Sequence, residues 1–177
     1  MREPCGSLAA AAIISAASTS AVLTADDIRT RNDDVMRQLS AKHLQAVDVC
    51  SDGNCFFRAL SVCLNGHQDN HLSLRKLISS HVLKQAEAAH PADRAALRQR
   101  AQEVAADGFW PGEDIVLAAS DFLKRPILVY AAHGNSSPIQ YLPSSSINTL
   151  SPISVAFFEA GHYMAVISAL NEQQGNL

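Results

Sequence analysis

A polar, glycine-bearing corner that leads straight into an apolar helix is the feature that most constrains this chain. The corner runs from Asp52 to Asn54, and Cys55 follows it. The apolar residues after it have the i, i+3, i+4, i+7 spacing of one helix face: Phe56, Ala59, Leu60 and Cys63. Asn65-Gly66 is a helix stop signal. The pattern therefore predicts a half-buried helix that starts at Cys55 and carries a thiol at its N-terminal end.

The remaining patterns place helices early in the chain and strands late. Helical patterns occupy residues 24–39, 55–64, 74–81, 92–106 and 113–125, and strand patterns occupy residues 44–49, 127–131, 139–142, 153–158 and 162–169. On the helix of residues 74–81, we expect Leu74, Leu77, Ile78 and His81 to share one inward face. Residues 159–161 join the last two strands as a hairpin. This order predicts an α+β, or mixed α/β, layered fold.

The chain divides into one domain and two short ends. Its 177 residues, 47% of them hydrophobic and 18% charged, suit a single globular domain with its own core. Residues 8–23 form a mild apolar run, but Glu3 precedes it and serines and threonines dilute it, so we expect no signal peptide. Residues 1–23 are expected to be a loose or helical extension, or the edge of an excised domain. Residues 24–170 are expected to form the folded domain, and residues 171–177 a flexible tail.

Charge and cysteine usage argue against several classes of function. The formal net charge is −3 and no basic run occurs, so we expect neither nucleic acid nor a membrane surface as a partner. The four cysteines are Cys5, Cys50, Cys55 and Cys63, and they form no CxxC pair and no Cys/His cluster with zinc spacing. We therefore expect reduced thiols in a cytoplasmic compartment, with no metal and no other cofactor.

The position of Cys55 gives its thiol a chemical use. The unsatisfied N–H groups and the dipole of a helix N-terminus stabilise a sulfur anion, so we expect a lowered pKa for Cys55. The backbone N–H groups of Gly53, Asn54 and Cys55 are candidates for an oxyanion hole. Glycine at position 53 also allows a substrate to approach the backbone closely. The corner could therefore supply a nucleophile and the donors that stabilise its intermediate.

A nucleophilic cysteine needs an imidazole base, and one histidine stands out. The chain contains His43, His67, His71, His81, His90, His133 and His162. Of these, only His162 opens an apolar strand directly after a glycine turn, where a polar ring has no evident packing purpose. We interpret His81 as a core histidine and the loop histidines as solvated. Cys55 and His162 are therefore the predicted catalytic pair.

Three blocks of the sequence resemble one family. The stretch DGNCFFRAL, residues 52–60, is similar to the D-G-x-C-[LF]-[FY]-R-A signature of ovarian-tumour (OTU) cysteine proteases. The block from Trp110 to Tyr130 and the terminal Gly161-His162-Tyr163 resemble the two later blocks of that family, in the same order. Together the blocks span about residues 44 to 168. The resemblance implies an OTU-like fold with a central sheet flanked by helices.

The resemblance also implies roles for individual residues. By position, Cys55 is the nucleophile and His162 is the general base and then the general acid. Asp52 matches the motif aspartate, which would organise the oxyanion loop or assist the active site. The expected substrate-binding positions are Trp110, Gly112, Glu113, Gly161 and Tyr163. For Trp110 the alternative is a core aromatic residue, and for Glu113 it is a simple helix-start acid.

One position departs from the family pattern. The family commonly has Asn or Asp two residues after the histidine, and here that residue is Met164, which accepts no strong hydrogen bond. Either another group orients His162 or the enzyme works as a dyad. The candidates for that group are Asp26, Asp27, Asp33, Asp34, Asp48, Asn148 and a backbone carbonyl. The sequence leaves this choice open.

The function that the resemblance implies is a deubiquitinating cysteine isopeptidase. Such an enzyme cleaves ubiquitin, polyubiquitin or a ubiquitin-like modifier from a lysine side chain, and we expect it to act as a monomer. If the source is a pathogen, the expected compartment is the host cytosol. The alternatives are a catalytically weak module that binds ubiquitin, suggested by Met164, and a cysteine protease that processes a polyprotein.

Overall fold

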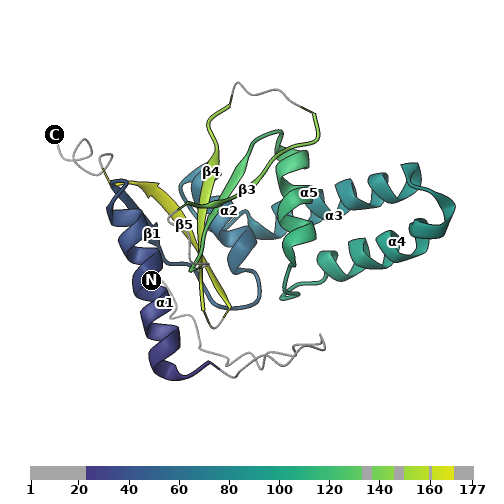
Figure 1. The fold of residues 1–177 in the computed structure, drawn as a ribbon. Coiled ribbons are helices and arrows are strands. Elements are labelled where there is room, and N and C mark those ends of the chain that lie inside the picture. The colour runs from purple at the N-terminus through teal and green to yellow at the C-terminus, as the bar shows by residue number, and fades with distance from the viewer. Residues whose placement is uncertain (1–22, 133–136, 146–149, 160, 170–177) are drawn as a thin grey trace.

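The computed structural model describes residues 23–132, 137–145, 150–159 and 161–169. Within these residues the chain forms five helices and one five-stranded mixed sheet (Figure 1). The expected α+β class, with a central sheet flanked by helices, is confirmed. The tail predicted at residues 171–177, and the predicted extension up to residue 22, lie outside the described residues, as does Asn148.

The sheet places β5 between two antiparallel neighbours. Its strands are β1 (Leu44–Val47), β2 (Ile127–Tyr130), β3 (Ile139–Tyr141), β4 (Ile153–Phe158) and β5 (His162–Ser168). Their order is β1-β5-β4-β2-β3, and only the β2–β4 pair is parallel. The predicted hairpin is present, with Phe158 opposite His162. His162 is therefore the first residue of a strand that is hydrogen-bonded on both sides.

Helices cover both faces of this sheet. They are α1 (Ala25–Ser40), α2 (Cys55–Asn65), α3 (His71–Ala88), α4 (Pro91–Ala105) and α5 (Glu113–Leu123). On one face, Val35 and Leu39 of α1 pack against the sheet. On the other face, α2 and α5 join α3 around a larger core. Because side chains alternate along a strand, successive residues of β5 face these two cores in turn.

Local signals explain where the predicted helices begin and end. Thr24 and Asp27 form a reciprocal capping box at the start of α1. Gly66 ends α2 in the left-handed conformation, as the stop signal predicted. One expectation for α3 is wrong, because Leu77 is half exposed while Leu74 and Ile78 are buried. The buried face of α3 instead runs through Arg75, which becomes important below.

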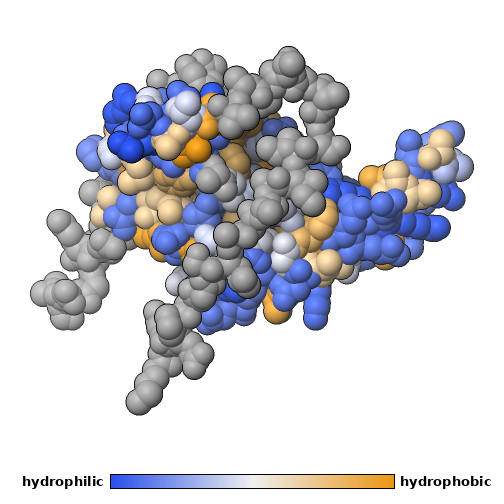
Figure 2. All heavy atoms as spheres, turned by 90° about the horizontal axis from the view of Figure 1, so that it is seen from below, coloured by the Kyte–Doolittle hydropathy of each residue, from blue (hydrophilic) through white to orange (hydrophobic). Residues whose placement is uncertain are grey.

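The helices α3 and α4 form a hairpin that projects from the body of the protein (Figure 1). Only Ala101 and Val104 of α4 are buried, and the arm is mostly hydrophilic on the face seen in Figure 2. The hydroxyl of Ser79 donates to the Ala101 carbonyl at 2.7 Å and so joins the two helices. Among the described residues, no helix is both long and apolar enough to span a bilayer.

Candidate active site

Cys55 begins α2 and is 1% exposed. The backbone N–H groups of Tyr163, Phe56 and Cys55 itself point at the sulfur. Burial raises the pKa of the thiol, the charge of Asp52 adds to this, and the N–H groups only partly oppose it. The expected lowering of the pKa is therefore wrong for this conformation, because desolvation outweighs the helix N-terminus.

His162 lies beside the loop that precedes the cysteine. Its Nε2 is 2.8 Å from Oδ1 of Asp48, and its Nδ1 is 3.0 Å from Oγ of Ser51. A carboxylate only accepts hydrogen bonds, so the contact with Asp48 favours the tautomer with hydrogen on Nε2, in which Nδ1 accepts from Ser51. The backbone N–H of Tyr163, the residue after His162, points toward the Cys55 sulfur. The fold thus brings the predicted nucleophile and the predicted base to one end of β5.

The strand register explains why Asp48 reaches the ring. Val47, the last residue of β1, pairs with Ala165 of β5. Extending this register by one residue places Asp48 opposite Met164, the position at which the family usually carries Asn or Asp. Paired residues of antiparallel strands project from the same face. The acceptor missing from β5 is therefore supplied by the neighbouring strand.

The other described acids considered for this role lie on one helix, and three of them have partners there. Asp26, Asp27, Asp33 and Asp34 all lie on α1. Asp27 caps that helix, and Asp26 and Asp34 pair with arginines on the same helix. Of the described candidates, Asp48 is the one that contacts His162.

Both ring nitrogens of His162 are engaged, which defines a resting arrangement. Each imidazole nitrogen offers one in-plane hydrogen-bonding position. Asp48 occupies one and Ser51 occupies the other. Acceptance of a proton by Nδ1 would therefore require that it first leave the Ser51 hydroxyl.

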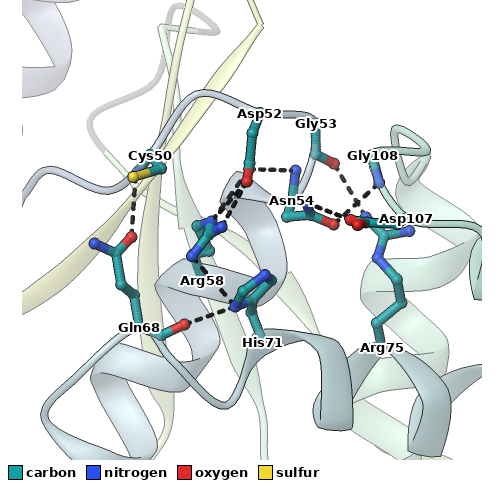
Figure 3. A network of polar contacts seen from close by, with 10 residues as sticks. All are labelled: Cys50, Asp52, Gly53, Asn54, Arg58, Gln68, His71, Arg75, Asp107 and Gly108. Atoms are coloured by element: carbon teal, nitrogen blue, oxygen red, sulfur yellow. Dashed lines mark hydrogen bonds and ion pairs between the residues drawn. The ribbon is translucent and has the colours of Figure 1, made fainter. Parts of the chain in front are cut away.

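Asp52 contacts Arg58 rather than His162. The guanidinium donates to both carboxylate oxygens at 2.5–3.1 Å, and the N–H of Asn54 donates to Oδ1 at 3.1 Å. Burial opposes the ionised form, but these hydrogen bonds outweigh it and hold the pKa of Asp52 at about 2. Arg58 also contacts His71 (Figure 3). Asp52 therefore braces the loop and does not touch the reacting groups.

The corner itself is clamped to the segment after α4. The side chain of Asn54 donates to Asp107 at 2.8 Å and accepts from the N–H of Gly108 at 3.2 Å (Figure 3). Gly53 has φ +79°, and a Cβ there would lie 2.0 Å from the Gly108 carbonyl oxygen. Because the N–H of Asn54 is donated to Asp52, Gly53 and Cys55 are left as the expected oxyanion donors.

An aromatic cluster flanks the histidine. Trp110, 39% exposed, has its ring 5.7 Å from that of Tyr163, and its edge lies over Gly161. The expected positions Trp110, Gly161 and Tyr163 are thus brought together. Gly112 instead adjoins the Arg100–Asp114 ion pair, and Glu113 is an exposed first residue of α5.

Two residues of the site escaped the reasoning from sequence. Ser51 gave no signal, because serine in a polar loop is commonplace. Arg75 did carry a signal in the sequence. It lies on the same helical stripe as Ile78 and Val82, and a charged side chain is unusual on a buried stripe.

Comparison with known proteins decides the family. A family model described as "OTU-like cysteine protease" matches residues 50–163. The chain belongs to this family. The match covers the cysteine, the histidine and the loop between β1 and α2 from Cys50 onward. The resemblance noted in the sequence is thereby confirmed.

Individual OTU proteins give the extent of the likeness. The OTU domain-containing deubiquitinating enzyme 7 of Arabidopsis thaliana is 31% identical over 133 residues, which are 74% of this chain. The chain spans only 35% of that relative's length. The solved OTU domain of OTUD1 superposes with a TM-score of 0.67, at 21% identity, over 79% of this chain and 97% of that domain. An OTU domain solved in complex with ubiquitin has a TM-score of 0.53, at 21% identity, over 70% of this chain and 69% of its own.

The close approach at Gly53 predicts a selective effect of adding one methyl group. In this OTU chain, Gly53→Ala forces the Gly108 carbonyl away and should destabilise the fold and abolish most activity. Gly66→Ala is the matched control, because Gly66 has φ +78° with nothing within 4 Å of the added Cβ. The control should lose only about 1–2 kcal/mol of unfolding free energy, the cost of the left-handed backbone. Denaturant melts and activity assays of both variants test this; equal losses would contradict the proposed clash.

Proposed function

We propose that this chain is a cysteine isopeptidase that hydrolyses the bond between the C-terminus of ubiquitin, or of a ubiquitin-like modifier, and a lysine. The observation that carries the proposal is the contact between Asp48 and His162, next to a cysteine whose sulfur is faced by the N–H of Tyr163, the residue after His162. The Arabidopsis relative is named a deubiquitinating enzyme, and one OTU neighbour was solved in complex with ubiquitin. Both support ubiquitin as the substrate class.

The first half of the reaction forms a thioester. Nδ1 of His162 leaves Ser51 and accepts the proton of Cys55, and the positive charge of the imidazolium that forms stabilises the thiolate. The thiolate attacks the carbonyl carbon at the modifier's C-terminus, and the N–H groups of Gly53 and Cys55 stabilise the oxyanion. The protonated imidazole then gives its proton to the lysine nitrogen as the C–N bond breaks. The lysine leaves as a free amine.

The second half restores the enzyme. His162 accepts a proton from water, the hydroxide attacks the thioester, and the sulfur leaves as a thiolate when the C–S bond breaks. The modifier departs with a free C-terminal carboxyl group, and the protonated imidazole returns its proton to the sulfur. Asp48 holds Nε2–H throughout and so keeps Nδ1 available for each proton transfer. In this proposal, Trp110 and Tyr163 line the path of the modifier's tail, and Gly161 lets it pass close to the backbone. Gly112 and the exposed carboxylate of Glu113 extend that path.

The alternative of a weak, purely binding module loses its main motivation. That alternative rested on Met164, and Asp48 now supplies an acceptor to the ring. A polyprotein-processing protease remains distinguishable by substrate, since it would cleave peptides that contain no ubiquitin. Action as a monomer in the cytoplasm stays a prediction.

The direct test is a ubiquitin probe with an electrophilic C-terminus. We expect a covalent adduct at Cys55 and none with Cys55→Ala, while Cys63→Ala, which removes a thiol further along α2, should still react. A panel of linkage-defined diubiquitins then gives the chain preference. No adduct with ubiquitin or with any ubiquitin-like modifier, together with cleavage of unmodified peptides, would overturn the proposal.

The contact of Asp48 with the His162 ring predicts that removal of the carboxylate charge lowers activity. Asp48→Asn should lower kcat by roughly 10- to 100-fold, less than the ~10⁴-fold typical of a buried acid, because this carboxylate is largely exposed. Asp33→Asn, which changes another of the acids considered, should leave kcat unchanged. Steady-state kinetics on a fluorogenic ubiquitin conjugate measure both variants. Equal kcat values for wild type and Asp48→Asn would mean that the ring is oriented by another group.

The hydrogen bond between the Ser51 hydroxyl and Nδ1 of His162 predicts that removal of the hydroxyl raises activity. A neutral hydrogen bond contributes about 1 kcal/mol, so Ser51→Ala should raise kcat/KM by up to about 5-fold, because Nδ1 no longer has to leave the hydroxyl. Ser51→Thr keeps a hydroxyl and should match wild type. A fall in kcat/KM for Ser51→Ala would show that the hydroxyl supports catalysis instead of competing with it.

A further inference from the structure

The guanidinium of Arg75 lies in the interior behind the catalytic loop. Arg75 is 1% exposed and reaches four backbone carbonyls from α3. Nη1 donates to Val104 at 2.8 Å and to Ala106 at 2.9 Å. Nη2 donates to Phe109 at 2.9 Å and to Gly53 at 3.1 Å (Figure 3). One side chain therefore joins α3, the segment after α4 and the loop before Cys55.

The surroundings of the Arg75 side chain do not favour the stability of the fold. The ion pairs found among the described residues do not include Arg75, so its charge is buried against carbonyl dipoles and the face of the Phe57 ring, 4.3 Å away. Its Nε is buried with no hydrogen-bond partner in the described part of the chain. Burying a charge and an unsatisfied donor opposes folding, and an apolar side chain would avoid both penalties. The position of Arg75 therefore indicates a role beyond packing.

Arg75 fixes one particular peptide group. The Gly53 carbonyl accepts from Arg75, while the N–H of the same peptide unit, on Asn54, donates to Asp52. The Gly53–Asn54 peptide is thus held at both ends, which restrains the rotation of its plane. Because the oxyanion donors proposed above flank this peptide, their directions depend on it.

We propose that Arg75 is a positioning residue, whose guanidinium fixes the oxyanion loop. This inference rests on the proposed function for its catalytic consequence. The side chain of Asn54, the other residue of the held peptide, donates to the Asp107 carboxylate, so the loop is held from the same segment after α4 that Arg75 binds.

Two substitutions remove the hydrogen-bonding fork. Arg75→Lys keeps a charged donor, but a single ammonium cannot reach all four carbonyls. Arg75→Met keeps the length of the side chain and removes every donor. Ser79→Ala is the control, because it breaks another buried hydrogen bond between α3 and α4, to the Ala101 carbonyl, far in the sequence from the loop.

Three measurements on each variant test the proposal: unfolding free energy, kcat and KM on a fluorogenic ubiquitin conjugate, and the pH profile of Cys55 alkylation by iodoacetamide, followed by peptide mass spectrometry. In folded protein, both Arg75 variants should lose roughly 10- to 100-fold in kcat with KM within about 3-fold, as expected when reacting groups are misplaced. Both Arg75 variants should move the alkylation profile to higher pH, because a displaced loop no longer aims the N–H groups of Cys55 and Phe56 at the sulfur. Ser79→Ala should lower the unfolding free energy and leave kcat, KM and the alkylation profile unchanged.

Other outcomes would contradict either the positioning role of Arg75 or the proposed function. If kcat and the alkylation profile of the folded variants match wild type, Arg75 is only structural and the inference is wrong. If Arg75→Met does not fold, Arg75→Lys decides through its kcat. Alkylation requires no ubiquitin, so a wild type inactive on ubiquitin but with the expected alkylation shift in Arg75→Met would contradict the proposed function and leave the positioning role standing.

Discussion

The pairing of β1 with β5 is the interaction on which the rest of the site depends. Its register ends with Val47 opposite Ala165, which carries the next residue, Asp48, to the ring of His162. On β5, the N–H of Tyr163 points toward the sulfur of Cys55, the first residue of α2. A slip of one residue would turn each of these side chains to the opposite face of the sheet. The catalytic contacts are therefore consequences of strand register.

The contacts seen at Cys55 and His162 differ from those that the proposed mechanism needs during reaction. The sulfur is buried, and that burial raises the pKa of the thiol. Nδ1 of His162 is engaged by the Ser51 hydroxyl. Around them the loop is rigid, because Asp52, Asn54 and Arg75 each fix a different part of it. The account thus places the moving part in one imidazole ring and the fixed part in the loop that receives the oxyanion.

Local patterns were enough to predict the elements and to single out Cys55 and His162, which the fold brings to one end of β5. Thr24, Gly66 and the stripe after Cys55 act within a few residues, so their effect is visible in the sequence. Contacts that join distant segments were not predictable. The choice of Asp48 depends on strand register, and the raised pKa of Cys55 depends on burial by elements far along the chain. The exposure of Leu77 was not predictable either, because helical spacing alone does not say which apolar side chains a neighbouring helix will cover.

The claim at the centre of this account is that β1 supplies the acid that orients the catalytic imidazole. Nitrogen NMR of protein labelled at the His162 ring reports directly which nitrogen of the neutral imidazole carries the hydrogen. The account predicts hydrogen on Nε2 in the wild type and a loss of that preference in Asp48→Asn. A wild-type ring with its hydrogen on Nδ1, facing Ser51, would contradict it.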